Sequence, residues 1–279
     1  MASGLFSTEP IPAGTRIACR VEYDGGRYCG WQSQPGDVAT VQDTLEAALA
    51  QVAAQPVRTH CAGRTDTGVH AHAQVVHFDA PVTRSAKAWV VGANANLPLD
   101  VRLHWAQPVA ADFHARFSAT ARRYRYVIAN AAVRPALLQG RVAWHRRPLA
   151  EAAMAEGAAC LPGEQDFSAF RAAACQSHTP WREVQEVQVW RRDELVVIDI
   201  RANAFLHHMV RNIAGALLAV GDGRRDPGWV ARLLASGDRS LGADTAPPCG
   251  LYLVDVSYPG TYGLPQTPYG PTLVGRPPA

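Results

Sequence analysis

The sequence predicts an α+β fold made of two similar halves, and three observations lead to this prediction. In residues 16–107, runs that alternate apolar with polar residues, typical of half-buried strands, are separated by helical apolar stripes. The order that results is β-α-β-β-α-β, the ferredoxin-like order that RNA-recognition modules share. The same order returns, with longer loops, in residues 122–258. Two such halves are expected to join their antiparallel sheets and to leave a central cleft, a natural place for a long polyanion.

The first half is predicted element by element. Alternating apolar residues predict a strand over residues 16–23, followed by a loop rich in glycine and aromatic residues. Thr40, with Asp43 three residues later, has the pattern of a helix N-cap, and the apolar stripe of a helix follows it. The remaining elements of this half are strands over residues 57–62, 74–78 and 101–107, and a helix over residues 85–97.

The second half follows from the same patterns. Its elements are strands over residues 122–129, 184–191, 195–201 and 251–258, and helices over residues 149–161, 205–220 and 226–235. The domain boundaries that follow are a loose tail over residues 1–15, a first half over 16–110, a second half over 111–262, and a Pro-rich, peripheral tail over 263–279.

Composition excludes several classes of protein. With 279 residues and 48% hydrophobic residues, the chain can bury a sizeable core. Its six cysteines are scattered without a Cys-x-x-Cys pair, which argues against structural zinc and against a disulfide framework. The first fifteen residues lack the pattern of a secretory signal, and the longest aliphatic run, residues 213–220, is too short to span a bilayer. We therefore expect a cytoplasmic protein without a membrane segment.

The basic residues favour contact with phosphates. The net charge of +3 is only mildly basic, but Lys87 is the single lysine, so 26 of the 27 basic residues are arginine. Arginine suits phosphate recognition because its planar fork binds two oxygens at once. A cluster of arginines is also the ordinary composition of a solvated face.

The stretch Cys61–Ala71, whose sequence is CAGRTDTGVHA, is a polar turn between two apolar runs. Gly63 and Gly68 can adopt backbone angles that other residues avoid, so the segment can bend sharply. Between them lie one carboxylate, Asp66, and one guanidinium, Arg64, which should favour the ionised carboxylate. By spacing alone this is a turn that either carries a catalytic carboxylate or has no chemical role.

Two further segments contain side chains that could bind RNA or take part in a reaction. Residues 112–126, DFHARFSATARRYRY, interleave four aromatic residues with basic groups, a composition suited to stacking on bases and to holding phosphates. The alternative is a strand whose tyrosines face the core and whose arginines face water. In residues 203–212, His207 and His208 point different ways on a helix and make a poor metal pair, so no metal site is predicted. Arg211 lies on an otherwise apolar helix and needs an anionic partner if it is buried.

These strings resemble one family. Gly-Arg-Thr-Asp-Thr-Gly-Val-His-Ala, at residues 63–71, is similar to the catalytic-Asp motif of the tRNA pseudouridine synthase A family, with Thr67 where that family usually has a small residue. The Arg-Tyr-x-Tyr strand beginning at Arg123 and the Gly-Leu-Tyr-Leu string beginning at Gly250 resemble its other motifs. The resemblance also includes Tyr23-Asp24-Gly25, Gly30-Trp31-Gln32 and Val41-Gln42, and runs from about residue 17 to about residue 271.

The resemblance implies a function and roles for single residues. The family converts uridine to pseudouridine at positions 38, 39 and 40 of tRNA, as a homodimer and without metal or organic cofactor. Asp66 then corresponds to the catalytic carboxylate, Arg211 to its ionic partner, and Tyr124 to a residue that packs on the target base and assists proton removal. Leu251 is expected to line the base pocket. The remaining candidates for substrate binding are Arg64, Arg116, Arg122, Arg123, Arg125 and His208.

Two other function classes remain open at the level of sequence. A non-catalytic RNA-binding or RNA-chaperone protein has no use for a carboxylate in a basic cleft, so loss of Asp66 would preserve its affinity. A sugar- or nucleoside-acting hydrolase ordinarily needs a second carboxylate near the first, and these strings offer only Asp66.

Overall fold

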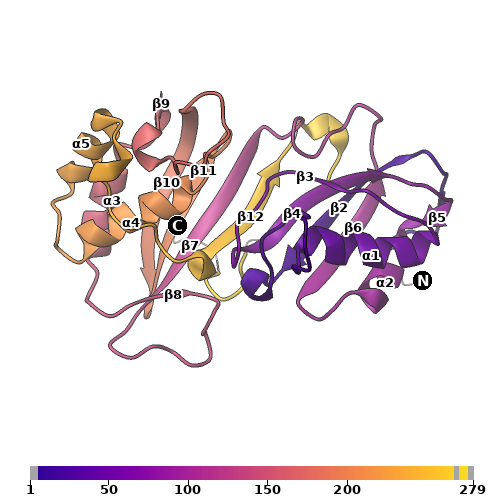
Figure 1. Cartoon of the computed structure of the whole chain (residues 1–279), viewed down its shortest axis with the longest axis horizontal. Coiled ribbons are helices and arrows are strands. Elements are labelled where there is room, and N and C mark those ends of the chain that lie inside the picture. Colours follow the sequence, from indigo (N-terminus) through magenta and orange to yellow (C-terminus); the bar gives the residue numbers. More distant parts are fainter. Residues whose placement is uncertain (1–5, 267–269, 276–279) are drawn as a thin grey trace. The chain divides into compact units, whose positions relative to one another are not determined.

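The computed structural model describes residues 6–266 and 270–275. Helices and antiparallel strands occur in both halves of the chain, which confirms the α+β class (Figure 1). The chain divides into two compact units. The first unit contains residues Met1–Thr120 and Leu253–Pro268, and the second contains Ala121–Tyr252 and Tyr269–Ala279. The ferredoxin-like topology of the halves, their joined sheet and a central cleft remain predictions.

The sheet of the first unit is antiparallel. Strand β2 (Arg16–Tyr23) lies between β6 (Val101–Pro108) and β4 (His70–Asp79), and the short β3 (His60–Cys61) pairs with β4. Strand β12 (Leu251–Ser257) is the other neighbour of β4. Strand β3 is thus much shorter than the strand predicted over residues 57–62, and β4 is much longer than the strand predicted over residues 74–78.

Two helices cover this sheet. Helix α1 (Val41–Ala53) begins after Thr40, whose side chain accepts a hydrogen bond from Asp43 N, as the sequence predicts. Helix α2 (Ala86–Asn96) is capped in the same way by Ser85. The two helices pack against each other, and α2 contacts β6 (Figure 1). Strand β2 is buried on both faces rather than half-buried, because even the Arg20 side chain is enclosed.

The N-terminal segment corrects a prediction. The loose tail expected over residues 1–15 contains strand β1 (Pro10–Ile11), which pairs with β5 (Arg84–Ser85). Ile11 is buried, so hydrophobic burial fixes this end of the chain on the first unit. Residues 1–5 of the predicted tail lie outside the described residues.

The second unit contains a mixed sheet. Its antiparallel strands follow the order β7-β11-β10-β9, and β8 pairs with β7 in parallel. Their bounds are β7 (Ala121–Asn130), β8 (Ala143–His145), β9 (Gly163–Asp166), β10 (Trp181–Arg192) and β11 (Leu195–Ala202). Strands β8 and β9 are absent from the sequence prediction because neither has an alternating apolar pattern.

The helices of the second unit are α3 (Glu151–Ala158), α4 (Met209–Gly221) and α5 (Gly228–Ser236), which lie together near β10 (Figure 1). Helix α4 begins four residues later than predicted. His208, immediately before it, has a φ of 61°, which does not continue a right-handed helix. His207 and His208 therefore precede α4 instead of lying on it. Within residues 6–266 and 270–275, no helix has both the length and the apolar character that crossing a membrane requires.

The C-terminal tail is not wholly peripheral. Gly270 O and Gly275 O both accept hydrogen bonds from Arg125 Nη1, at 2.6 and 3.0 Å. Val274 between them is fully buried. Residues 270–275 thus form part of the core of the second unit, while residues 267–269 and 276–279 of the predicted tail lie outside the described residues.

Candidate active site

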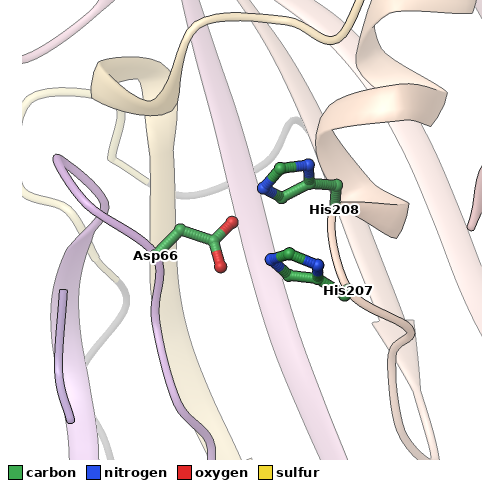
Figure 2. A group of neighbouring side chains, drawn as sticks. All are labelled: Asp66, His207 and His208. Atoms are coloured by element: carbon green, nitrogen blue, oxygen red, sulfur yellow. The ribbon is translucent and has the colours of Figure 1, made fainter. Parts of the chain in front are cut away.

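The turn between β3 and β4 carries Asp66. Its side chain is half-buried and projects from the turn, as Figure 2 shows. Arg64 and Thr67 on either side are exposed, whereas Thr65 is buried. Thr65 therefore anchors the turn, while Arg64 and Thr67 face solvent.

Side-chain and backbone hydrogen bonds fix Thr65 on both sides. Its hydroxyl lies 2.7 Å from the Tyr23 hydroxyl at the end of β2. Its carbonyl accepts a hydrogen bond of 3.0 Å from Trp31 N in the following loop. Inside the turn, Val69 N donates to Asp66 O at 3.1 Å. The backbone on which the Asp66 carboxylate is mounted is thus held by three contacts that do not use the carboxylate.

Two glycines allow this close approach. A Cβ atom on Gly25 would lie 1.9 Å from Val69 O, and one on Gly30 would lie 2.7 Å from Thr65 O. Both distances are shorter than any that real side chains adopt, and Gly30 also has a φ of +86°. The loop after β2 therefore packs its backbone directly against the Asp66 turn, which only glycine permits at these positions.

Gln74 closes the base of the turn. Its side-chain Nε2 donates to Gly63 O at 2.6 Å, and its Oε1 accepts from Gly63 N at 3.3 Å. The side chain of Gln74 is fully buried on β4. The side-chain amide of Gln74 thus makes two hydrogen bonds to the backbone of Gly63, as a neighbouring strand would. These bonds hold the start of the turn in place.

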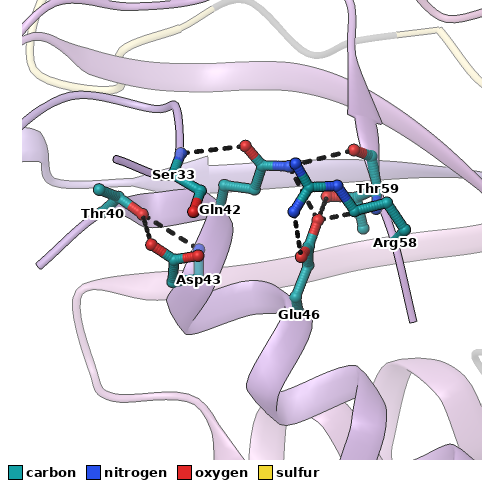
Figure 3. Close-up of polar contacts among 7 residues, drawn as sticks. All are labelled: Ser33, Thr40, Gln42, Asp43, Glu46, Arg58 and Thr59. Carbon is teal, nitrogen blue, oxygen red and sulfur yellow. Dashed lines mark hydrogen bonds and ion pairs between the residues drawn. The ribbon is translucent and has the colours of Figure 1, made fainter. Parts of the chain in front are cut away.

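A second polar network holds the loop that contains Trp31 (Figure 3). Gln42 on α1 accepts a hydrogen bond from Ser33 N and donates to Glu46 Oε1. Glu46 Oε1 also accepts hydrogen bonds from the backbone N and the hydroxyl of Thr59, at 2.8 and 2.9 Å. Because Gln42 N further donates to Trp31 O, the first turns of α1 position the loop that in turn holds Thr65.

Arg64 is the exposed guanidinium of this turn, and its effect on the ionisation of Asp66 remains a prediction. The two side chains come from a bent turn, and that of Arg64 extends into solvent. The proposal that Arg64 contacts RNA is taken up below.

The arginines of β7 are engaged inside the protein to different degrees. The guanidinium of Arg125 is only 1% exposed, and its Nε donates to Asp199 Oδ2 at 2.7 Å. Arg123 Nε donates to the other oxygen of the same carboxylate at 2.6 Å. A buried carboxylate with two guanidiniums is a structural arrangement. The prediction that Arg125 binds substrate is therefore wrong, because Asp199 and the backbone carbonyls of the C-terminal segment enclose it.

The aromatic residues of β7 are also largely buried. The rings of Tyr124 and Phe205 are in edge contact, with centroids 5.1 Å apart. The Tyr126 hydroxyl donates to Pro247 O at 2.8 Å, and burial raises the pKa of this phenol well above its usual range. Arg122 Nη1 donates to Asn203 O at 3.0 Å. Tyr124, at the rim of the core, is the tyrosine of this strand better placed for contact with a base.

The segment before α4 carries the remaining candidates. His207 and His208 lie side by side, with ring centroids 4.0 Å apart (Figure 2). Arg211, on the first turn of α4, is half-buried, and its Nε donates to Ala246 O at 2.8 Å. Leu251, at the start of β12, is buried. Gly250 before it lies so close to Val127 O and Tyr126 that a Cβ atom would clash with both.

Comparisons with known proteins identify the family of this chain. A family model described as tRNA pseudouridine synthase matches residues 20–118 and 158–259. The chain belongs to the tRNA pseudouridine synthase family. A protein of Legionella pneumophila (strain Lens) named tRNA pseudouridine synthase A is 55% identical over 259 residues, which are 93% of this chain and 98% of that protein.

Two further relatives have the same name. The protein of Photobacterium profundum is 54% identical over 93% of this chain and 99% of its own length. That of Idiomarina loihiensis is 52% identical, again over 93% of this chain and 99% of its own length. The similarity to these members of the tRNA pseudouridine synthase family extends over nearly the whole chain.

Most of the candidate residues lie within the segments that match the pseudouridine synthase family model. Asp66 and Arg116 lie in the first matched segment, and Arg211 and Leu251 lie in the second. Tyr124 lies in the stretch between the two segments. The roles of these residues are not settled by the match and are proposed below.

The sequence did not reveal the residues that position Asp66. Tyr23 and Gly30 belong to strings that resemble this family, but no role followed from them. Gln74 has no such signal beyond being a polar residue within an apolar strand. A buried amide in a strand is the feature that could have indicated a bond to a neighbouring turn.

Proposed function

We propose that this protein isomerises uridine to pseudouridine at positions 38, 39 and 40 in the anticodon arm of tRNA. The pseudouridine synthase family carries out this class of reaction, and relatives more than half identical are named for it. The choice among the three positions follows from the resemblance in the sequence motifs. The observation that carries the proposal is the half-buried carboxylate of Asp66 on a turn fixed from three sides.

The reaction is an isomerisation and needs no oxidant or reductant. The N1–C1′ bond of uridine breaks, the uracil turns, and a new bond joins its C5 to C1′, after which the proton on C5 is lost and N1 gains one. Positive charge develops at C1′ as in glycoside cleavage, where a carboxylate stabilises the cation or attacks it. We propose no metal and no organic cofactor for this chemistry.

Asp66 is proposed as that carboxylate. A group that meets developing charge works best when it is already in position, because no reorganisation is then needed during the reaction. The contacts of Thr65, Gly30 and Gln74 support such preorganisation, since they hold the backbone of the turn. A covalent ester at C1′ and removal of a sugar proton are both compatible with a carboxylate at this point.

The other roles follow from the resemblance. Arg211 is proposed to keep Asp66 ionised, and Tyr124 and Leu251 to lie on either side of the target uracil, which must leave the RNA stack before it reacts. Arg64 is proposed to contact the RNA backbone, which its exposed guanidinium suits. Arg116, Arg122 and His208 stay as candidates for RNA contact. Arg125 is withdrawn because it is buried, and Arg123 because its Nε is bonded to Asp199.

We further propose that the protein is a cytoplasmic homodimer and that one tRNA contacts both subunits. This proposal rests on the family resemblance alone. Sedimentation velocity at micromolar concentration, with and without tRNA, measures the mass of the free protein and of its complex. A monomeric free protein would contradict the dimer.

Mapping of pseudouridine on an unmodified tRNA transcript tests the function. The transcript is incubated with wild-type protein or with Asp66→Ala, and the anticodon arm is read position by position. Modification by the wild type alone, at one or more of positions 38–40, is the expected result. Modification by the variant as well would contradict the role of Asp66. Tight tRNA binding by both proteins without any modification would instead favour a non-catalytic RNA-binding protein.

A further inference from the structure

One aromatic residue beside the candidate active site is exposed. Of the four aromatic residues in the string 112–126, Phe113, Tyr124 and Tyr126 are buried, whereas Phe117 is 75% exposed. A single exposed apolar side chain is ordinary on a protein surface. The surroundings of Phe117 are what set it apart.

Phe117 ends a column of ring contacts, one of which is edge-on. Its centroid lies 4.4 Å from that of His114, and the His114 ring meets His77 edge-on, at 63° with centroids 4.6 Å apart. His77 in turn stacks on His60, with centroids 5.0 Å apart and an angle of 23° between the ring planes. Phe117 is thus mounted on a column of imidazoles that reaches the fully buried Phe113, which meets His77 edge-on.

The loop that carries Phe117 is fixed by its own hydrogen bonds. His114 Nδ1 accepts from Arg116 N at 3.1 Å, and Ala115 N donates to His77 Nδ1 at 3.1 Å. Tyr258 donates its hydroxyl to Ala115 O at 2.7 Å. The exposed ring therefore sits on a rigid loop, so little conformational freedom is lost when a ligand stacks on it.

The column is held in the uncharged form at its centre. Burial, together with the neighbouring His114 and His60, lowers the pKa of His77 to about 4. Burial likewise lowers the pKa of His114 below its usual range. Neutral rings can stack on each other without charge repulsion, which suits a supporting column rather than a set of phosphate ligands.

Positive charge lies next to the ring. The guanidinium of Arg116 is 5.6 Å from the Phe117 centroid. Arg64, on the Asp66 turn, is exposed. His60 lies on β3, which leads into the Asp66 turn, and its ring centroid is 5.6 Å from that of His114 on the Phe117 loop. The loop that carries Phe117 therefore lies against the strand that leads to the turn with Arg64.

We propose that Phe117 is a stacking site for an unpaired nucleobase of the tRNA, distinct from the uridine that reacts, and that Arg64 holds the adjacent phosphate. This proposal rests on the function proposed above, from which it takes the identity of the RNA. An open aromatic face stacks on any base, and a neighbouring guanidinium binds the backbone that connects it to the next nucleotide.

The affinity for a fluorescently labelled, unmodified tRNA transcript tests the site at fixed salt, because affinity for RNA depends on ionic strength. Phe117→Leu keeps the apolar character but removes the aromatic face, and Phe117→Tyr restores it. We expect Phe117→Leu to raise Kd by about 5- to 150-fold, the range of a lost base stack. Phe117→Tyr should stay within about threefold of the wild type.

Leu99→Ala is the matched control, because Leu99 is a 91% exposed apolar residue of the same unit. Its Kd should not change. An unchanged Kd for Phe117→Leu, or an equal loss for Leu99→Ala, would overturn the proposal. A loss of self-association in sedimentation with no change in Kd would do the same, since Phe117 would then contact protein.

A direct signature comes from 2-aminopurine placed at successive positions of the anticodon loop, because stacking quenches its fluorescence. Quenching at one position with the wild type and with Phe117→Tyr, but not with Phe117→Leu, is expected. Quenching that is identical in all three proteins would refute the stack. Both binding experiments read out without turnover, so they remain decisive even if no pseudouridine forms and the proposed function fails.

Discussion

Gly30→Ala is expected to reduce catalysis by moving the Asp66 turn. The added Cβ would lie 2.7 Å from Thr65 O, and an ordinary contact needs about 3.4 Å, so the turn or the loop must shift by roughly 0.7 Å. A misplacement of about 1 Å in an active site can reduce the rate by about 10²-fold. We therefore expect the maximal rate of pseudouridine formation to fall by about 10- to 100-fold.

The backbone strain at Gly30 has to be separated from this displacement. A residue other than glycine at positive φ costs about 1–2 kcal/mol in stability. Gly36 provides the control, because it has a φ of +96° in the same loop region and nothing within 4 Å of an added Cβ. Gly36→Ala should lose about the same stability from strain and keep full activity.

Single-turnover assays with enzyme in excess measure the maximal rate, and urea unfolding of each variant measures stability. A maximal rate for Gly30→Ala equal to that of the wild type would refute the positioning of Asp66 by this contact. Equal losses of rate in Gly30→Ala and Gly36→Ala would refute it too, since strain alone would then explain both.

Two further predictions concern stability. The pKa of His77 is lowered to about 4 in the folded protein, so the unfolded chain binds a proton first as the pH falls, and the free energy of unfolding should drop by about 3 kcal/mol between pH 6.5 and 4. Urea unfolding at several pH values in this range measures how steeply the free energy of unfolding depends on pH. This dependence should be weaker for His77→Asn than for the wild type, and an equal dependence would contradict the lowered pKa of His77. Asp199→Asn should lower the free energy of unfolding by about 3–5 kcal/mol, because it leaves Arg123 and Arg125 without their shared buried carboxylate. If urea unfolding shows a loss below about 1 kcal/mol, the ion pairs of Asp199 with Arg123 and Arg125 do not stabilise the fold.

Local patterns predicted the elements that depend on local interactions. The N-cap at Thr40 and the apolar stripe after it were sufficient for α1, which begins where expected. The start of α4 was misplaced because Phe205 and Leu206 continue its apolar pattern, whereas the positive φ of His208 has no sequence signal. Strand β4 was predicted too short because His70 and His72 are polar, yet both are buried.

The candidate site was predictable only in part. The Asp66 turn could be recognised from its string of residues, but its supports come from β2, from α1 and from the middle of β4. The misassigned Arg125 shows the same limit, because its partner Asp199 lies 74 residues away in the sequence. An alternating pattern gives the face of a strand but not what covers that face.

The most direct test of the account compares Asp66→Asn with the wild type in two measurements on the same unmodified tRNA. The amide keeps the size of the side chain and removes its charge. The account predicts that the maximal rate of pseudouridine formation falls by roughly 10⁴-fold or more, as when a central catalytic group is removed, while Kd for tRNA stays within about threefold. A maximal rate within tenfold of the wild type would contradict the central claim that the carboxylate of Asp66 carries the reaction.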